Sequence, residues 1–496
     1  MNDGPLRIMG GRFVDVEAGR FYPDGTSLLV DSGRIRSMLD HRPDGREGRA
    51  VDLGGRAVVP GLFNTHSHIH LVAPSLMLGW GEWLQVNRLR QRQIEKALRD
   101  CLDRGITIIQ DGLPDELSLN RKLASRIEEG RIPGPRIHQT VHVTPLGGAF
   151  APRRTLRGRV MRRMMCLSNI DYEDIDSGVL VFPPDAPAQA ARDAVDRAVD
   201  ERGATVIKFY DQRERGVSYK PGARIMTQAQ LDAAADQARV RGVNTLIHHL
   251  TVESFRRAVR AGVHSLIHVP LDAPLTERDI EAFMEAGCTI EPTLTLAYFY
   301  SWDLEGHACH GHPRMRALDE ARRRTRQDVA RDSWLPELAG AMTRGMEQAG
   351  RGRMRMTTFI EMSQVFRYFS AYASQGMDNV RLLWSHGARD RIACGNDAGP
   401  AWCSQASIPL ELDMFALCLN EDADDAFTPA DALRIATINS ARAMGLEESF
   451  GTLEEGKVAD LVVLDGNPLE DMSVTGSRAA AVFKNGRLEV DRCGLG

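Results

Sequence analysis

No stretch of the 496-residue sequence approaches about 18 consecutive apolar residues, so we expect no membrane-spanning helix. The first residues, MNDGPLRIMGG, lack a charged start followed by an apolar core, which predicts no secretory signal. The eight cysteines form no Cys-x-x-Cys pair, which indicates reduced thiols and a cytoplasmic location. The 62 basic residues nearly balance the 67 acidic ones, so no broad basic surface is available for nucleic acid. We therefore expect a large cytoplasmic globular protein whose partner is a small molecule, not a membrane or a nucleic acid.

Apolar stretches rich in Val, Ile and Thr alternate along the chain with segments of helical periodicity. Four helices are expected to begin at threonines that can cap them, namely Thr227, Thr251, Thr276 and Thr428. An open doubly wound sheet usually has about five to seven strands, so eight strands followed by helices favour a (β/α)8 TIM barrel. The expected strands lie near residues 57–63, 106–110, 136–143, 204–209, 243–248, 264–268, 287–293 and 390–395.

Both ends of the chain have a different pattern, with short alternating strands and glycine-containing turns. Residues 1–56 and 452–496 are therefore predicted to form a small β-sandwich domain beside a barrel of residues 57–451. The stretch 298–388 is far longer than an ordinary barrel connection and is rich in arginine and helical pattern. It is either a solvated helical excursion or a lid over the C-terminal mouth of the barrel.

The sequence VVPGLFNTHSHIHL contains the strongest local signal for chemistry. His66 and His68 are two residues apart at the end of an apolar strand, so their side chains point to the same side. Two neutral imidazoles in this arrangement can form half of a transition-metal site. A single His-x-His pair is weak evidence, because two histidines can also simply pack.

Further polar residues follow other predicted strands. Lys208 closes the apolar ATVIKF stretch and either extends its ammonium group to solvent or is carbamylated, which requires the neutral amine that burial favours. His248, His268 and Asp397 follow the fifth, sixth and eighth strands. Because barrel enzymes place their chemistry at the C-terminal ends of strands, this ordered series points to an active site.

These motifs together resemble the amidohydrolase superfamily of metal-dependent hydrolases, in the carboxylated-lysine branch that includes imidazolonepropionase-like and prolidase-like enzymes. VVPGLFNTHSH resembles the family's PGLxDxHxH, although Asn64 replaces the aspartate, and IACGNDAG resembles its GTDAG. IHHLTVESFRRAVRAGVHSLIH resembles the segment with the fifth-strand and sixth-strand histidines, in a register that selects His248 over His249. The tail from TPADALRIATINSARAMGL to KVADLVVLDGNPLED resembles the family's C-terminal signature.

The resemblance implies a barrel enzyme with two divalent metal ions. One ion would bind His66, His68 and Asp397, and the other would bind His248 and His268, with carbamylated Lys208 bridging them. Zinc is the commonest metal in relatives, and manganese or cobalt also suits these ligands. The resemblance also implies a homo-oligomer.

The reaction implied is hydrolysis of a C–N amide bond by a metal-bridging hydroxide. Asp397 would act as general base and then general acid. His142 or Tyr210 would polarise the substrate carbonyl, and Arg153 would meet a substrate carboxylate. The substrate would be peptide-like, an N-acyl amino acid or a cyclic amide.

Two alternatives remain open at this point. A mononuclear deaminase of a heterocycle would commonly carry a glutamate three residues after the fifth-strand histidine, where this chain has Thr251. A catalytically inactive barrel that acts as a binding protein would usually have lost several ligands, whereas all six positions are filled here.

Overall fold

The structure, a computed structural model, describes residues 4–39, 48–72, 80–114, 116–148, 156, 159–160, 163, 170–212, 224–296, 332–350, 375–399, 404–420 and 426–495. Arg153 lies outside the described residues, as does most of the predicted 298–388 excursion. The part of that excursion that is described begins at residue 332 and includes α11 (Pro336–Gly350) and α13 (Met377–Ser385).

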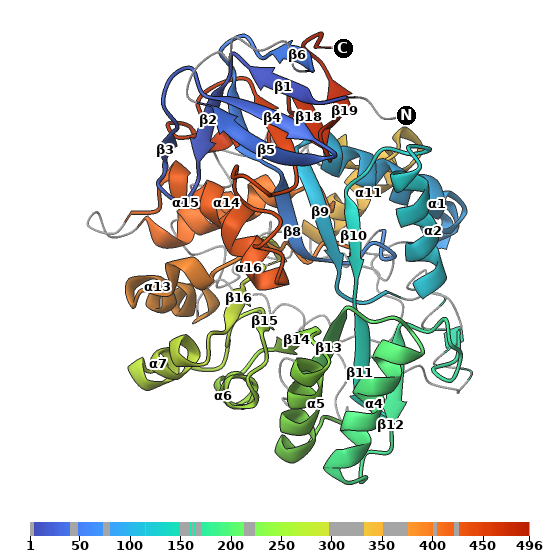
Figure 1. Cartoon of the computed structure of the whole chain (residues 1–496). Coiled ribbons are helices and arrows are strands. Elements are labelled where there is room, and N and C mark those ends of the chain that lie inside the picture. The colour runs from blue at the N-terminus through green and yellow to red at the C-terminus, as the bar shows by residue number, and fades with distance from the viewer. Residues whose placement is uncertain are drawn as a thin grey trace.

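Two sheets at one end of the molecule are built from strands of the N-terminal and the C-terminal parts of the chain (Figure 1). The first has the order β5-β4-β1-β6 and the second β19-β18-β17-β7-β2-β3. Apolar side chains from both sheets, including Phe13, Leu28 and Phe483, form one buried cluster. The strands are β1 (Leu6–Met9), β2 (Arg12–Asp15), β3 (Arg20–Phe21), β4 (Ser27–Asp31), β5 (Arg34–Leu39), β6 (Arg49–Asp52), β7 (Ala57–Pro60), β17 (Leu461–Leu464), β18 (Ala481–Lys484) and β19 (Arg487–Asp491).

The expected first barrel strand, near 57–63, is two strands in the structure. β7 pairs with β17 in the terminal sheet, whereas β8 (Leu62–Ser67) pairs with the next parallel strand. Gly61 separates them, and it lies so close to Thr107 that a Cβ at this position would be 2.2 Å from Thr107 Oγ1. The chain therefore passes between the two sheets where only glycine fits.

The remaining strands are parallel and lie in two further sheets, β10-β9-β8 and β12-β11-β13-β14-β15-β16. Only Thr140 separates β10 from β11, so these two strands continue one line of chain between the sheets. This gives a TIM-barrel-like α/β arrangement. The strands are β9 (Ile106–Asp111), β10 (Arg136–Gln139), β11 (Val141–Pro145), β12 (Val179–Phe182), β13 (Val206–Asp211), β14 (Asn244–His249), β15 (Ser265–Ile267) and β16 (Thr289–Glu291).

Residues 392–398 lie between β16 and β8, the facing edge strands of these two sheets, and do not themselves form a strand. Ala393 N donates to Ile290 O at 2.9 Å, and Thr65 N donates to Cys394 O at 2.9 Å. The expected strand at 390–395 is therefore wrong in detail, since a 3-10 turn at Ala388–Arg391 precedes this irregular segment. Asp397 has a φ of 45°, and an L-residue in this left-handed region interrupts an extended strand.

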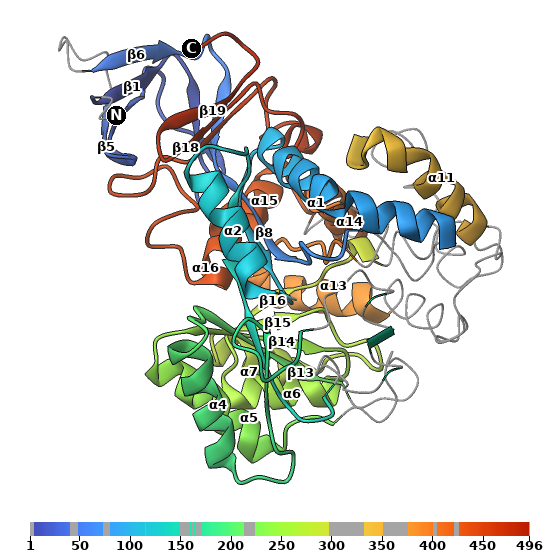
Figure 2. The ribbon, with the colours of Figure 1, turned by 90° about the vertical axis from the view of Figure 1, so that its right-hand side faces the viewer.

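Helices lie beside the strands, and α11 lies against α1 in Figure 2. Arg92 Nη1 of α1 is 2.9 Å from Glu337 Oε1 of α11. This ion pair connects α11, which belongs to the predicted excursion, to α1. The other helices are α1 (Trp80–Asp103), α2 (Leu117–Glu128), α4 (Ala188–Asp200), α5 (Gln228–Val240), α6 (Val252–Ala261), α7 (Glu277–Glu285), α14 (Ile408–Leu419), α15 (Pro429–Arg434) and α16 (Ser440–Met444), with a π-helical turn at Ile435–Asn439 and a 3-10 turn at Met472–Val474.

The four predicted helix starts are confirmed. Thr227, Thr251, Thr276 and Thr428 each accept a hydrogen bond from the backbone N–H three residues later, and each forms a reciprocal capping box. At the other end of α6, Gly262 has a φ of 68° and closes the helix in the left-handed conformation. These local signals fix where α5, α6, α7 and α15 begin relative to the preceding segments.

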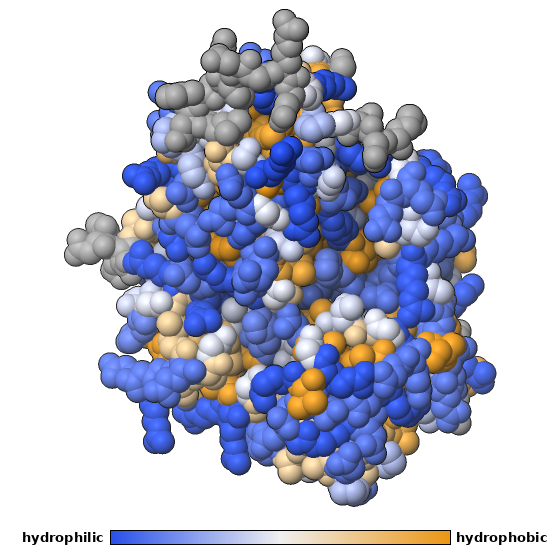
Figure 3. Space-filling view, viewed as in Figure 1, coloured by the Kyte–Doolittle hydropathy of each residue, from blue (hydrophilic) through white to orange (hydrophobic). Residues whose placement is uncertain are grey.

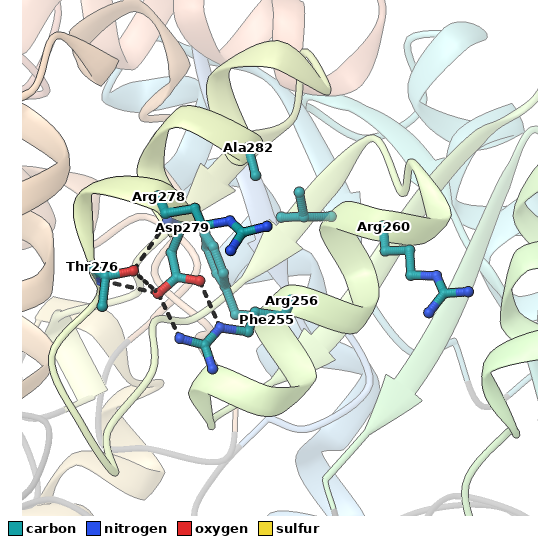
Figure 4. A pocket seen from close by; sticks show the side chains of 8 residues that line it. Phe255, Arg256, Arg260, Thr276, Arg278, Asp279 and Ala282 are labelled. Carbon is teal, nitrogen blue, oxygen red and sulfur yellow. Dashed lines mark hydrogen bonds and ion pairs between the residues drawn. The ribbon is translucent and has the colours of Figure 1, made fainter.

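The surface of the described residues carries one pocket of note, which lies away from the predicted site. In the part of the chain that the structure describes, no helix is both long enough and apolar enough to cross a bilayer. The face seen in Figure 3 is largely hydrophilic, with small apolar patches over the region of α4 and α5. Figure 4 shows a pocket between α6 and α7, where Arg256 Nε and Nη2 contact the Asp279 carboxylate at 2.6 and 2.9 Å. None of the predicted site residues lines this pocket.

Candidate metal centre

Three donor groups meet at one end of the parallel strands. His66 lies in β8, His68 directly follows that strand, and Asp397 lies in the 392–398 segment beside it. Asp397 Oδ1 is 3.3 Å from His66 Nε2 and 2.8 Å from His68 Nε2. All three residues are buried, and their donor atoms lie within 4.8 Å of one another. This group could hold a metal ion.

Burial and mutual contact set the charges of this group. Burial, followed by the charge of Lys208, lowers the pKa of His66 to about 3. Burial alone would raise the pKa of Asp397, but its contacts with His66 and His68 outweigh burial and hold the pKa well below its usual range. Neutral imidazole and ionised carboxylate are the forms that bind metal ions.

Three glycines allow the chain to pack closely around His66 and His68. A Cβ on Gly112 would lie 2.4 Å from His66 Cε1, and one on Gly395 would lie 2.7 Å from His66 Cβ. At Gly399, which has a φ of 121°, a Cβ would lie 2.7 Å from the carbonyl oxygen of His68. Side chains at these positions would displace the two histidines.

Lys208 lies in the middle of β13 and is 2% exposed. Its Nζ is 3.5 Å from His66 Nε2. Burial lowers the pKa of Lys208 to about 8, although the carboxylates of Asp397, Glu291 and Asp111 oppose this shift. An amine with this pKa is about half neutral near pH 8, and the neutral amine is the form that reacts with CO2.

A second pair of histidines lies beside this group. His248, in β14, and His268, directly after β15, have their Nδ1 and Nε2 atoms 3.0 Å apart. The rings of His268 and His66 are 6.0 Å apart between centroids, so the two pairs form one cluster. His249, the neighbour that the sequence register did not select, instead packs against the ring of Phe255, at 5.7 Å between centroids.

The structure therefore brings six of the predicted side chains into one cluster, although Lys208 lies inside β13 and not at its end as expected: His66, His68, Lys208, His248, His268 and Asp397. The donor set combines imidazole nitrogens and a carboxylate, with the Lys208 amine beside them. Such nitrogen and oxygen donors suit zinc and also manganese or cobalt. The residues present thus fit a metal centre.

The three predicted substrate contacts have different outcomes. Tyr210 stacks on His248, with ring centroids 4.6 Å apart and an angle of 8° between the planes. His142 is fully buried in β11 and is in register with Lys208 of β13. Arg153 falls outside the described residues.

Sequence reasoning missed several polar residues around the cluster. Gln212 Oε1 lies 2.8 Å from both the Tyr210 hydroxyl and His248 Nε2. Thr293 Oγ1 lies 2.7 Å from His268 Nδ1. The sequence gives no signal for either residue, because Gln212 lies three positions after the expected strand 204–209 and Thr293 lies within the expected strand 287–293.

Asn64, which replaces the aspartate of the family motif, makes two hydrogen bonds through its side chain. Its Nδ2 donates to Asn396 Oδ1 at 2.9 Å and to Gln405 O at 2.8 Å. Gln405 Nε2 in turn donates to the carbonyl of His68 at 3.0 Å. Asn64 therefore ties β8 to the chain on both sides of residues 400–403.

Comparisons with known proteins identify the family and the fold of the chain. A model of the amidohydrolase family matches residues 57–488. An imidazolonepropionase of Symbiobacterium thermophilum is 36% identical over 107 residues, which are 20% of this chain and 23% of the relative. The chain thus matches about a quarter of the length of that curated relative.

Solved structures share the fold along nearly the whole chain. A prolidase in complex with N-methylphosphonate-L-proline has a TM-score of 0.68 and 23% identity, covering 98% of this chain and 100% of that chain. The ochratoxinase of A. niger has a TM-score of 0.66 and 17% identity, covering 99% of this chain and 97% of that chain. At these identities the likeness shows a shared TIM-barrel-like α/β fold.

Proposed function

Since the chain belongs to the amidohydrolase family, we propose that it is a metal-dependent hydrolase that cleaves a C–N amide bond. The observation that carries this proposal is the convergence of four histidines, one lysine and one aspartate in one cluster. The substrate class is peptide-like, an N-acyl amino acid or a cyclic amide, as the names of the prolidase and imidazolonepropionase relatives suggest.

The proposal includes a closed eight-stranded barrel and a β-sandwich domain. The hydrogen bonds of residues 392–398 to both neighbouring strands support closure of the barrel. The apolar cluster shared by the two terminal sheets supports a sandwich. We further propose a cytoplasmic homo-oligomer that takes a small-molecule substrate.

Two divalent metal ions would be held at this site. His66, His68 and Asp397 would hold one, His248 and His268 would hold the other, and carbamylated Lys208 would bridge them. The contact of Lys208 Nζ with His66 Nε2 at 3.5 Å supports this division. When bound, such ions acidify water and stabilise negative charge on a carbonyl oxygen.

Asp397 is suited to proton transfer in this reaction. Its contacts with two imidazoles keep the carboxylate ionised, so Oδ1 or Oδ2 can accept a proton from the attacking water and then donate it to the leaving nitrogen. Tyr210 lies on β13, the strand of Lys208, and His142 lies on the neighbouring strand β11, so either could orient the substrate carbonyl.

The structure gives no support to the mononuclear deaminase. That alternative calls for a glutamate at position 251, whereas Thr251 caps α6 by accepting a hydrogen bond from Ser254 N. The buried position of Lys208 beside His66 favours the hydrolase with two metals.

Metal content per chain tests the proposal in wild type and Lys208→Ala, both purified without chelator. We expect about two metal ions in wild type and a clear loss in the variant. One ion in both proteins would give Lys208 a packing role and favour the deaminase. No metal in either protein, even after zinc or manganese is supplied, would favour a binding protein.

Activity provides the second test. Wild type should hydrolyse at least one member of a panel of Xaa-Pro dipeptides, N-acyl amino acids and cyclic amides. Asp397→Asn should keep the fold by circular dichroism and lose most turnover, because the amide cannot accept the proton. Unchanged turnover in this variant would refute the role of Asp397.

A further inference from the structure

His248 and His268 each have one ring nitrogen facing the other histidine and one facing an oxygen atom. The facing atoms are His248 Nδ1 and His268 Nε2, at 3.0 Å. The outer atoms are His248 Nε2, which meets Gln212, and His268 Nδ1, which meets Thr293. Which ring nitrogen carries the proton therefore depends on what these two outer partners can accept.

Gln212 fixes the proton of His248. The side-chain oxygen of Gln212 can only accept hydrogen bonds, and it receives one from the Tyr210 hydroxyl at 2.8 Å. Its contact with His248 Nε2, also at 2.8 Å, therefore requires the proton to be on Nε2. His248 Nδ1 is left with a lone pair directed at His268.

Thr293 fixes the proton of His268 by the same reasoning. The single hydroxyl hydrogen of Thr293 is used in a hydrogen bond to the carbonyl of Pro292 at 2.7 Å. Thr293 Oγ1 must then accept from His268 Nδ1, which places the ring proton on Nδ1. His268 Nε2 is left with a lone pair directed at His248.

Two lone pairs that face each other at 3.0 Å repel, and a cation that both nitrogens bind removes the repulsion. The surroundings thus keep two acceptor atoms aimed at one place.

We propose that Gln212 and Thr293 are positioning residues that hold His248 and His268 in complementary tautomers, so that Nδ1 of one and Nε2 of the other bind the same divalent cation. This inference rests on the proposed function, since it concerns the second of the two metal positions. The rival explanation is that both hydrogen bonds only stabilise the fold.

Zinc binding to the apo protein separates these explanations. We would compare wild type with Gln212→Leu and Thr293→Val, which remove the acceptors at nearly constant size. The matched controls are Gln212→Glu and Thr293→Ser, which keep an acceptor oxygen. Equilibrium dialysis with zinc gives the stoichiometry and both dissociation constants, and thermal unfolding of each apo protein measures the effect on stability separately.

We expect the Leu and Val variants to bind one zinc ion as wild type does and the other about 10–100-fold more weakly. The Glu and Ser variants should keep both ions. Folded Leu and Val variants with wild-type affinity for both ions would overturn the proposal. If Gln212→Leu does not fold, loss of the second ion in Thr293→Val with recovery in Thr293→Ser supports the proposal, and equal binding in both overturns it.

Imidazole 15N chemical shifts of the metal-free protein give a readout that does not depend on metal. Wild type should show His248 protonated on Nε2 and His268 on Nδ1, and the opposite tautomer of either ring would overturn the proposal. If wild type shows these tautomers but binds fewer than two zinc ions, the proposed two-metal function fails while the tautomer assignment holds. If wild type binds two ions and the variants are unaffected, only the positioning proposal fails.

Discussion

Replacing Gly112 with alanine should damage the metal centre through one added methyl group. Gly112 directly follows β9, and its N–H donates to Ser67 O at 2.7 Å. The new Cβ would lie 2.4 Å from His66 Cε1 and 2.7 Å from His66 Nδ1. The imidazole must therefore move by about 1 Å to reach ordinary van der Waals contact, which is about twice the 0.5 Å tolerance of a catalytic geometry.

The ring of His66 has little space into which it could move. His66 is 1% exposed, and Gly395 already packs against its backbone and Cβ on another side. Gly112 does not have a positive φ, so the alanine adds crowding without backbone strain. We therefore expect zinc affinity at the site of His66, His68 and Asp397 to fall by about 100-fold, with a corresponding loss of turnover.

Equilibrium dialysis with zinc and denaturant unfolding would be carried out on Gly112→Ala and on the control Gly81→Ala. Gly81 is an exposed residue of α1 with no atom within 4 Å of the position of a new Cβ. The control should keep wild-type zinc binding and gain up to about 1 kcal/mol from helix propensity. A folded Gly112→Ala protein with wild-type zinc affinity would refute the reasoning, because the close contact with His66 would then not constrain the site.

Two further predictions concern stability away from the centre. The Arg256 guanidinium lowers the pKa of Asp279 to about 2, so this pair stabilises the fold above about pH 3.8 and the stability is lost as the pH falls toward 2. Because the Arg256 side chain is 58% exposed, Asp279→Asn should cost only about 1 kcal/mol at pH 7, and its difference from wild type in urea unfolding should shrink toward pH 2 and disappear below it. Arg257 contacts the buried carboxylate of Asp211 at 3.1 Å, and Arg257→Met should cost about 3–5 kcal/mol in denaturant unfolding because it removes this guanidinium from the carboxylate. Equal stability of Arg257→Met and wild type would contradict this account.

Features that depend on near neighbours in the chain were predictable from the sequence. A threonine before an amphipathic segment can satisfy the exposed N–H groups of that helix in any fold, so Thr227 and Thr276 fix helix starts. The strand predicted at 390–395 is wrong for the opposite reason. Its path is determined by hydrogen bonds to Ile290 and Thr65, which lie far away in the sequence.

The residues of the candidate site likewise fall into those that the sequence predicts and those that it does not. The close approach of His66 and His68 follows from alternation along a single strand, and the family motifs indicate the partners of this pair. Gln212 and Thr293 have no characteristic spacing, because their importance comes from which ring nitrogen each one meets. Contacts of this kind become visible only when the strands are side by side.

Backbone strain is also concentrated at the centre. Of the five described non-glycine residues with positive φ, three are His268 at 74°, Thr293 at 53° and Asp397 at 45°. Each such residue costs about 1–3 kcal/mol, and the conformation is least favourable for a β-branched residue such as Thr293. The surroundings must therefore hold Thr293 in place against its own preference.

Glu411 of α14 supplies that restraint. Its Oε1 accepts from Leu294 N at 2.7 Å and its Oε2 accepts from Thr295 N at 2.7 Å, so one buried carboxylate holds the two residues that follow Thr293. In Glu411→Gln the amide nitrogen cannot accept, and one buried N–H would lose its partner at a cost of about 1–3 kcal/mol. We expect lower stability in urea together with weaker binding of one zinc ion, because Thr293 is then free to leave its strained conformation. The control is Glu281→Gln, an exposed residue of α7 that should change stability by less than about 0.5 kcal/mol. A Glu411→Gln protein that is destabilised but binds both zinc ions with wild-type affinity would show that Thr293 keeps its place without this carboxylate.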